Sequence, residues 1–238
     1  MQNASNRRPF NRSLKRLIIS LFVIIALFVL LIVTIGLPEE AVEPYILGEE
    51  AIKNTFASDS FRYKCRSTLY IEEEERIFSV LNGEKAGDGR HVEGSILGSP
   101  VNIYHLGETA YQQDSLNGAW HTIENIELGS AKMLLSEIDP AKDFSYSEVL
   151  SAEYLGKIDV EGEKAKHLVL KVVLTDKWIE RYFTDITYDL AVRDKGEPCL
   201  LWAVVSAVSK ENPAATLVIE NYFYDYGEEI TLSPPVIQ

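Results

Sequence analysis

The sequence predicts a mainly antiparallel β domain of the α+β class, preceded by one transmembrane helix, and two observations support this. The segment 17–37 carries no charged side chain, and 17 of its 21 residues are Leu, Ile, Val or Phe. At 1.5 Å of rise per residue it is about 31 Å long, which matches a hydrocarbon core of about 30 Å. After it, apolar and polar residues alternate with period two in short segments separated by turn-forming sequences.

The residues on either side of the span set its orientation. Five cations and no acid precede it, and five glutamates follow it between residues 39 and 50. Because positive charge stays on the cytoplasmic side, we expect a cytoplasmic tail, 1–16, a spacer, 38–44, and an extracytoplasmic domain, 45–238. A cleaved signal peptide is the alternative, but its apolar region is shorter and ends in small residues. We therefore expect an uncleaved anchor, and no cysteine near the exit provides a lipid attachment site.

The predicted domain is acidic and contains two cysteines. Of the chain's 23 basic side chains, five lie in the N-terminal tail, so 18 remain against 36 acidic ones. This charge argues against nucleic acid or anionic lipid headgroups as surface partners. Outside the cytoplasm a disulfide between Cys65 and Cys199 is chemically allowed, and two separate buried thiols fit the sequence equally well.

Most of the domain is predicted to form strands. In residues 61–71, the apolar Phe61, Tyr63 and Cys65 alternate with basic side chains, which indicates a half-buried antiparallel strand. We expect a turn in the acidic run 72–75. The other expected strands are residues 76–82, 90–97, 101–106, 110–113, 120–123, 145–155, 164–174, 186–192, 199–208, 216–226 and 230–232.

Three helices are expected among these strands. Residues 45–56 have rough helical spacing before the first strand. In residues 131–138 the apolar side chains fall at i, i+3, i+4 and i+7, which is one stripe of an amphipathic helix. Residues 175–182 are expected to contain another short helix, with a capping residue at its start.

The sequence contains no motif for a nucleophile with its base, a metal set or a phosphate cradle, so we predict neither an enzyme nor a cofactor. The four histidines lie singly on predicted strands without ligand spacing, and four consecutive glutamates point in different directions rather than around a cation. Tyr222, Tyr224 and Tyr226 are expected to share one face of a strand, packed or half exposed.

The remaining mechanism is passive, in which a curved sheet and an apolar helix enclose an apolar molecule. The alternative is that the helix only completes the core. Strand alternation and the helical stripe predict an inward-facing set of Phe61, Tyr63, Leu69, Ile96, Ile103, Met133, Leu134, Ile138, Leu168, Leu170 and Val172.

Several short motifs, in a fixed order, resemble one family. The segments YQQ at 111–113 and GAW at 118–120 resemble a pair of strands, and Leu134-Leu135 with Asp139-Pro140 follow on the expected helix. The run AEYLGKIDVEGEKAKHL, residues 152–168, resembles a strand–turn–strand unit, and FYDYGEEITLSP, residues 223–234, resembles the end of the domain. Together, over residues 45–235, they resemble the LolA/LppX-like superfamily of bacterial envelope lipoprotein carriers and lipid-binding proteins.

The resemblance implies an unclosed β-barrel, or half-pipe, of about ten antiparallel strands with helices plugging an apolar cavity. It also implies binding of acyl chains or lipoproteins without catalysis. The expected anchor and the missing lipid-attachment cysteine depart from soluble carriers, so lipid handling beside one bacterial cytoplasmic membrane fits better than shuttling. The alternative is an interaction or sensory protein whose domain docks another envelope protein; an unrecognised hydrolase is a third reading.

Overall fold

The computed structural model describes residues 43–107, 109–123, 139–175, 177–233 and 235–237, and its strands form one sheet. Residues 42–238 form a compact unit. The strands are β1 (Ser60–Ile71), β2 (Glu74–Ala86), β3 (Gly89–Ile96), β4 (Ser99–Leu106), β5 (Thr109–Gln113), β6 (Trp120–Ile123), β7 (Tyr146–Val160), β8 (Glu163–Leu174), β9 (Phe183–Arg193), β10 (Leu200–Ser209) and β11 (Ala215–Tyr224). The helices are α2 (Pro44–Ala57), the 3-10 helix η1 (Pro140–Phe144) and α4 (Lys177–Tyr182).

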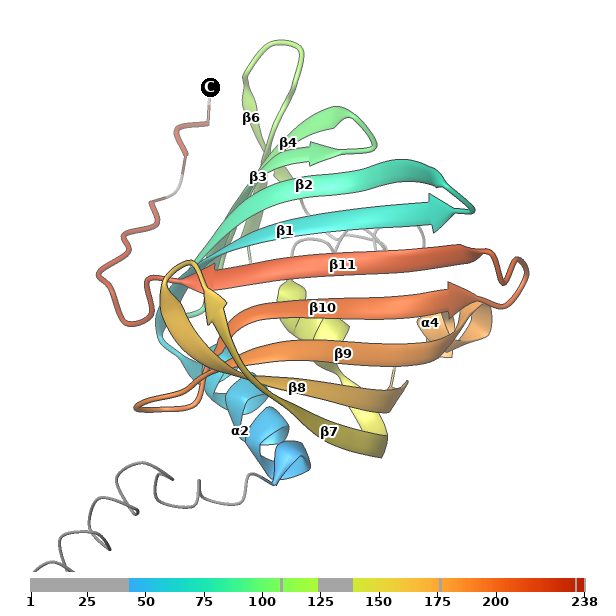
Figure 1. Cartoon of the computed structure of the whole chain (residues 1–238). Coiled ribbons are helices and arrows are strands. Elements are labelled where there is room, and N and C mark those ends of the chain that lie inside the picture. The colour runs from blue at the N-terminus through green and yellow to red at the C-terminus, as the bar shows by residue number, and fades with distance from the viewer. Residues whose placement is uncertain (1–42, 108, 124–138, 176, 234, 238) are drawn as a thin grey trace, which may run out of the picture. The chain divides into compact units, whose positions relative to one another are not determined.

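The first and last strands of the sheet are neighbours in its middle. The spatial order is β6-β5-β4-β3-β2-β1-β11-β10-β9-β8-β7, and the pairings between neighbours are all antiparallel. Two meanders, β1 to β6 and β7 to β11, are therefore joined side by side through β1 and β11 (Figure 1). This confirms the predicted antiparallel domain.

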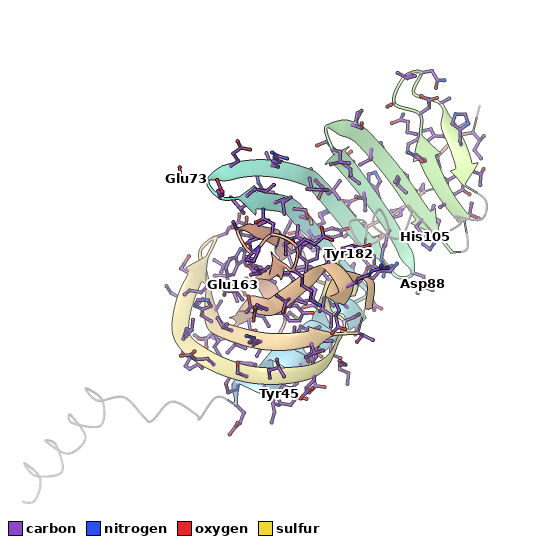
Figure 2. The ribbon with its side chains drawn as sticks, turned by 90° about the vertical axis from the view of Figure 1, so that its right-hand side faces the viewer. Tyr45, Glu73, Asp88, His105, Glu163 and Tyr182 are labelled. Carbon is purple, nitrogen blue, oxygen red and sulfur yellow. The ribbon has the colours of Figure 1, made fainter. Side chains whose placement is uncertain are left out.

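The sheet is strongly curved and does not close. Its two edge strands, β6 and β7, are not paired with each other among the described strands. Figure 2 shows β7 and β8 curving round at one end while the hairpins of β3 to β6 extend away at the other. The observed sheet thus agrees with the half-pipe that the family resemblance implied.

Alternation along β1 separates an inner from an outer face. Phe61, Tyr63 and Cys65 are at most 3% exposed and face the core, which defines the inner face of the sheet. On the outer face, Arg62 forms ion pairs with Glu84 at 2.7 Å and with Asp225 at 2.9 Å. The predicted division of this strand into apolar and basic faces is confirmed.

Helix α2 covers the inner face at β7 to β10, and its close approach depends on Gly48. A Cβ atom at this position would lie 2.9 Å from Leu170 Cδ1, so no larger residue fits without a shift. The buried Thr55 then ties α2 to β10, because its hydroxyl oxygen accepts a hydrogen bond of 2.8 Å from the Leu200 N–H. The same hydroxyl donates to the Ala51 carbonyl at 2.7 Å.

An aromatic cluster fills the inner face beside α2. Phe144 of η1 has its ring centroid 5.5 Å from Phe56 of α2, 5.3 Å from Tyr188 of β9 and 6.5 Å from Phe223 of β11. The Tyr188 hydroxyl donates a hydrogen bond of 2.8 Å to the Asp143 carbonyl. Helices α2 and η1 therefore plug one end of the half-pipe, which Figure 1 shows from the other side of the sheet.

Three details differ from the sequence prediction. Asn82-Gly83 was expected to end a strand, but β2 continues to Ala86 because Gly83 lies under the ring of Tyr63. The expected strand 230–232 does not form. Tyr226 does not share a face with the tyrosines of β11, because Asp225 has φ 55° and breaks the alternation.

Because the alternation of side chains is broken at Asp225, Tyr226 packs toward the core. Its ring lies 5.9 Å from the ring of Phe61, and its hydroxyl donates a 2.6 Å hydrogen bond to the Leu200 carbonyl. The sheet-face prediction for three tyrosines is therefore wrong for this one.

The two cysteines are buried free thiols in the structure. Burial raises the pKa of the Cys199 thiol above its ordinary value. The predicted anchor, 17–37, and the predicted helix, 131–138, lie outside the described residues. Among the helices that are described, none is long and apolar enough to span a membrane.

Candidate functional site

The inner face of the half-pipe carries rows of side chains that cross the sheet from strand to strand. Residues paired in register point to the same face, so each row can be followed through the strand pairings. One row is Tyr154, Leu168, Leu190, Ala203, Asn221, Cys65, Leu81, Gly94 and Val101. The next row is Ala152, Leu170, Tyr188, Val205, Ile219, Ser67, Ser79, Ile96 and Ser99. Both rows are mostly apolar and contain no charged side chain.

The structure places the described members of the predicted lining set on this face. Strand β8 contributes Leu168, Leu170 and Val172, which are at most 4% exposed. Phe61 and Tyr63 of β1 and Ile103 of β4 are also buried, whereas Leu69 and Ile96 are half buried. The predicted residues Met133, Leu134 and Ile138 lie outside the described residues.

Six of these eight side chains belong to one hydrophobic core cluster, which also contains Ala51 of α2 and Phe144 of η1. Near the plugged end of the half-pipe they therefore pack against protein. Farther along, Leu69 pairs with Leu217, and both side chains stay half buried. The described inner face is therefore less covered at Leu69 and Leu217 than beside α2.

Hollows of the described surface lie around this sheet. One of about 390 Å³ lies between β7, β8, β9 and α4, and the predicted Val172 lines it together with Phe183, Ile186 and Lys210. Another, of about 450 Å³, lies beside the end of α2 and is lined by polar groups that include Asn54 and Arg193. Only the first contains a residue of the predicted lining set.

Two buried polar side chains on the inner face were not predicted. Asn221 and Ser67 are both 0% exposed, and the Asn221 amide nitrogen and oxygen and the Ser67 hydroxyl have no hydrogen-bond partner. Leaving such a group unsatisfied costs roughly 1–3 kcal/mol. A signal was present in the sequence, because Asn221 interrupts the apolar phase set by Leu217, Ile219 and Phe223.

Buried tyrosines mark the plugged end of the face. Burial raises the pKa of the Tyr63 hydroxyl well above its ordinary value. The pKa of Tyr188 is raised as well, first by burial and then by the charge of Asp143. Both hydroxyls thus stay neutral through the physiological range.

In the part of the chain that the structure covers, no group of three or more His, Cys, Asp or Glu side chains is arranged to hold an ion. The nearest approach to a charge relay is His167, whose Nε2 lies 2.5 Å from Asp189 Oδ1 on the outer face. His91 lies 2.9 Å from Asn102 Oδ1 and stacks on Tyr104.

An unclosed antiparallel half-barrel with an apolar inner face plugged by helices defines the class of this domain. No protein-family model matches the sequence, and no curated protein matches it. Lipoprotein LppX of Mycobacterium tuberculosis matches in structure with a TM-score of 0.52 and 10% identity, covering 81% of this chain and 100% of LppX. LprF from Mycobacterium bovis matches with a TM-score of 0.54 and 11% identity, covering 84% of this chain and 99% of LprF.

At these identities the similarity shows the fold alone. The domain has the LolA/LppX-like fold, which confirms what the sequence motifs had indicated.

Proposed function

We propose that residues 45–238 bind a lipid, an acyl chain or another apolar ligand on the inner face of the half-pipe, without catalysis. The observation that carries this proposal is the apolar face itself, which continues from buried residues beside α2 to half-buried ones such as Leu69, Ile96 and Leu217. At about 25 cal/mol per Å², an acyl chain that buries a few hundred Å² there gains several kcal/mol before association costs. The LppX-like fold supports the same proposal.

The direct test is native mass spectrometry of residues 42–238 purified without detergent. This segment is a compact unit that contains all the described strands and the core. We expect a bound lipid in the spectra, or uptake of a fluorescent acyl probe at micromolar concentration. A domain that is folded by circular dichroism, carries no lipid and takes up no probe contradicts the proposal and favours docking of an envelope protein.

A pair of neighbouring substitutions locates the ligand. Leu69 faces inward and is half buried, whereas Tyr70 is 39% exposed on the outer face. Leu69→Asp places a charged, hydrated carboxylate on the apolar face where the acyl chain lies, so probe affinity is expected to fall at least about tenfold. Tyr70→Asp is the matched control and leaves affinity unchanged; equal effects of the two changes count against an inner-face site.

The second part of the proposal is that residues 17–37 hold this domain at the outer face of a bacterial cytoplasmic membrane. Residues 1–16 then lie in the cytoplasm and 38–44 form the spacer. Protein isolated from membranes is expected to retain its N-terminus, as mass spectrometry of the intact chain measures, and protease added from outside should digest only the domain. A mature N-terminus near Pro38 would show that the segment is a cleaved signal.

A further inference from the structure

Most of the aromatic side chains described on the outer face of the sheet lie in two neighbouring rows. Residues paired in register share a face, so each row can be followed from strand to strand. One row, from β11 to β5, is Tyr224, Arg62, Glu84, His91, Tyr104 and Tyr111. The row beside it begins with Trp202 and Tyr222 and ends, on β4 to β6, with Asn102, Gln113 and Trp120. The next row towards the β1–β2 turn, from Val204 to Pro100, contains no aromatic residue.

At one end of the two rows, rings and amides hold one another in place. The ring of His91 stacks on Tyr104 at 4.0 Å between centroids, and Trp120 meets Tyr104 edge-on at 5.5 Å. His91 Nε2 lies 2.9 Å from Asn102 Oδ1, and the Asn102 amide donates to Gln113 Oε1 at 3.3 Å. The Gln113 amide in turn donates to a backbone carbonyl of the β5–β6 loop at 3.0 Å. We call His91, Asn102, Tyr104, Gln113 and Trp120 the outer platform.

The outer platform can make further contacts. Its five side chains are half buried, so part of each stays accessible. An amide has two N–H donors and a carbonyl with two lone pairs, and the bonds described above use only part of this capacity. Beside Gln113 there is a hollow of about 330 Å³, and its other lining residues are Pro100, Gln112, Asp114, Ser115 and His121. Hollows from about 300 Å³ upward hold small ligands.

The charges of the two rows balance. They contain two cations, Arg62 and Lys64, and two acids, Glu84 and Glu93. Arg62 is ion-paired with Glu84 at 2.7 Å, while Glu93 is in register with Asn102 of the outer platform. A polyanion therefore finds no excess of cations here. Neither row contains an aliphatic side chain, which argues against the acyl region of a membrane.

Neutral amides beside aromatic rings match the chemistry of a sugar. A pyranose ring has faces of C–H groups, which pack on the electron-rich faces of aromatic rings. Its hydroxyls donate and accept, and so do the amides of Asn102 and Gln113. Neighbouring strands are about 4.8 Å apart, close to the length of one sugar unit in an extended chain. Across the seven strand steps from β10 to β6 the rows extend over about 34 Å, which suits a chain of several sugars.

We propose that the outer platform binds an uncharged linear glycan, and that the glycan chain runs across the strands along the two rows towards Tyr224 and Trp202. The hollow beside Gln113 receives one end of the chain. This site lies on the opposite face of the sheet from the proposed apolar ligand and does not depend on it. One molecule can therefore hold an apolar ligand and a glycan at the same time.

The test uses the full chain in phosphatidylcholine nanodiscs, with isothermal titration calorimetry and protein-free nanodiscs as the blank. The probes are two neutral hexasaccharides, cellohexaose and chitohexaose, the disaccharide of each, and the anionic hexagalacturonate. We expect at least one neutral hexasaccharide to bind about tenfold or more tightly than its disaccharide, because the shorter molecule reaches only part of the rows. Hexagalacturonate is expected to bind more weakly than either, because Glu93 repels it.

Matched substitutions locate the glycan. Tyr104→Ala and Trp120→Ala each remove a ring of the outer platform and should weaken the bound hexasaccharide at least about tenfold. Tyr70→Ala makes the same exchange at a tyrosine that is 39% exposed on the outer face but lies outside the two rows, so it should change nothing. Thermal unfolding checks that each variant is folded. If Tyr104→Ala unfolds, Trp120→Ala on the edge strand β6 decides alone.

Four results would overturn the inference. The first is that neither hexasaccharide binds the wild type. The second is that folded variants of the outer platform bind as tightly as Tyr70→Ala. Equal affinity for a hexasaccharide and its disaccharide would mean that the face holds a single sugar, such as a lipid headgroup, and tighter binding of hexagalacturonate would mean that it selects a polyanion. None of these results bears on the inner-face ligand, which uptake of the acyl probe tests separately.

Discussion

Raising the pH from 9 to 11 is expected to lower the free energy of unfolding by about 2.7 kcal/mol through Tyr63 and Tyr188 alone. Both side chains are at most 1% exposed, and burial raises the pKa of each above its ordinary value near 10. The folded protein therefore keeps two protons that the unfolded chain releases. This stability is fully present below pH 10 and is lost as the pH rises above it.

Urea unfolding at pH 9, 10 and 11 measures this effect. Tyr188→Phe removes the contribution of one of these two tyrosines, so its loss over the same range should be smaller by about 1.4 kcal/mol. Its stability at pH 9 is expected to be lower by about 1 kcal/mol, because the hydrogen bond to the Asp143 carbonyl is gone. Tyr70→Phe, at an exposed site, is the control. The explanation fails if all three proteins lose the same stability between pH 9 and 11.

Gly83→Ala is expected to destabilise the domain by about 3 kcal/mol, although it adds only one methyl group. A Cβ atom at this position would lie 2.0 Å from Tyr63 Cζ and 2.4 Å from its hydroxyl oxygen. The ring is 1% exposed and packs beside Phe61 at 6.1 Å and Phe223 at 6.4 Å between centroids, so a displaced ring would press on these neighbours. Either β2 or the aromatic cluster must shift.

A double-mutant cycle isolates the cause of this loss. Shortening the side chain by Tyr63→Leu removes the ring atoms that the alanine meets, so Gly83→Ala should then cost much less than in the wild type. Thermal or urea unfolding of the four proteins gives the coupling energy. An equal cost in both backgrounds would mean that the backbone of β2, rather than the ring, requires glycine.

Gly83 also shows where local sequence reasoning stops. Asn-Gly is a strong turn signal over short range, yet here the long-range packing of Tyr63 uses the glycine in mid-strand. Conversely, the alternation of Phe61, Tyr63 and Cys65 was sufficient to assign their face, because a buried face fixes every second residue. The alternation does not hold for Tyr226, because the preceding residue, Asp225, has a positive φ that turns the Tyr226 side chain to the other face.

For the candidate site, the sequence predicted which side chains lie on the inner face of the sheet, but not which of them become neighbours there. Leu168 and Leu170 were assigned inward correctly, since both lie in the middle of an alternating strand. That Asn221 comes to lie beside Ser67 depends on the pairing of the first strand with the last, which no local pattern specifies. The unsatisfied amide is visible only once that register is known.

The pairing of β1 with β11 has a consequence for how the chain folds. Each meander pairs strands that are close in sequence, whereas Cys65 and Asn221, in register across this seam, are 156 positions apart. Closing so large a loop has a high entropic cost before any contact repays it, so contact order makes the seam a late event in folding. Each half of the sheet, β1 to β6 and β7 to β11, can therefore form from local pairings before the pairing of β1 with β11 joins them.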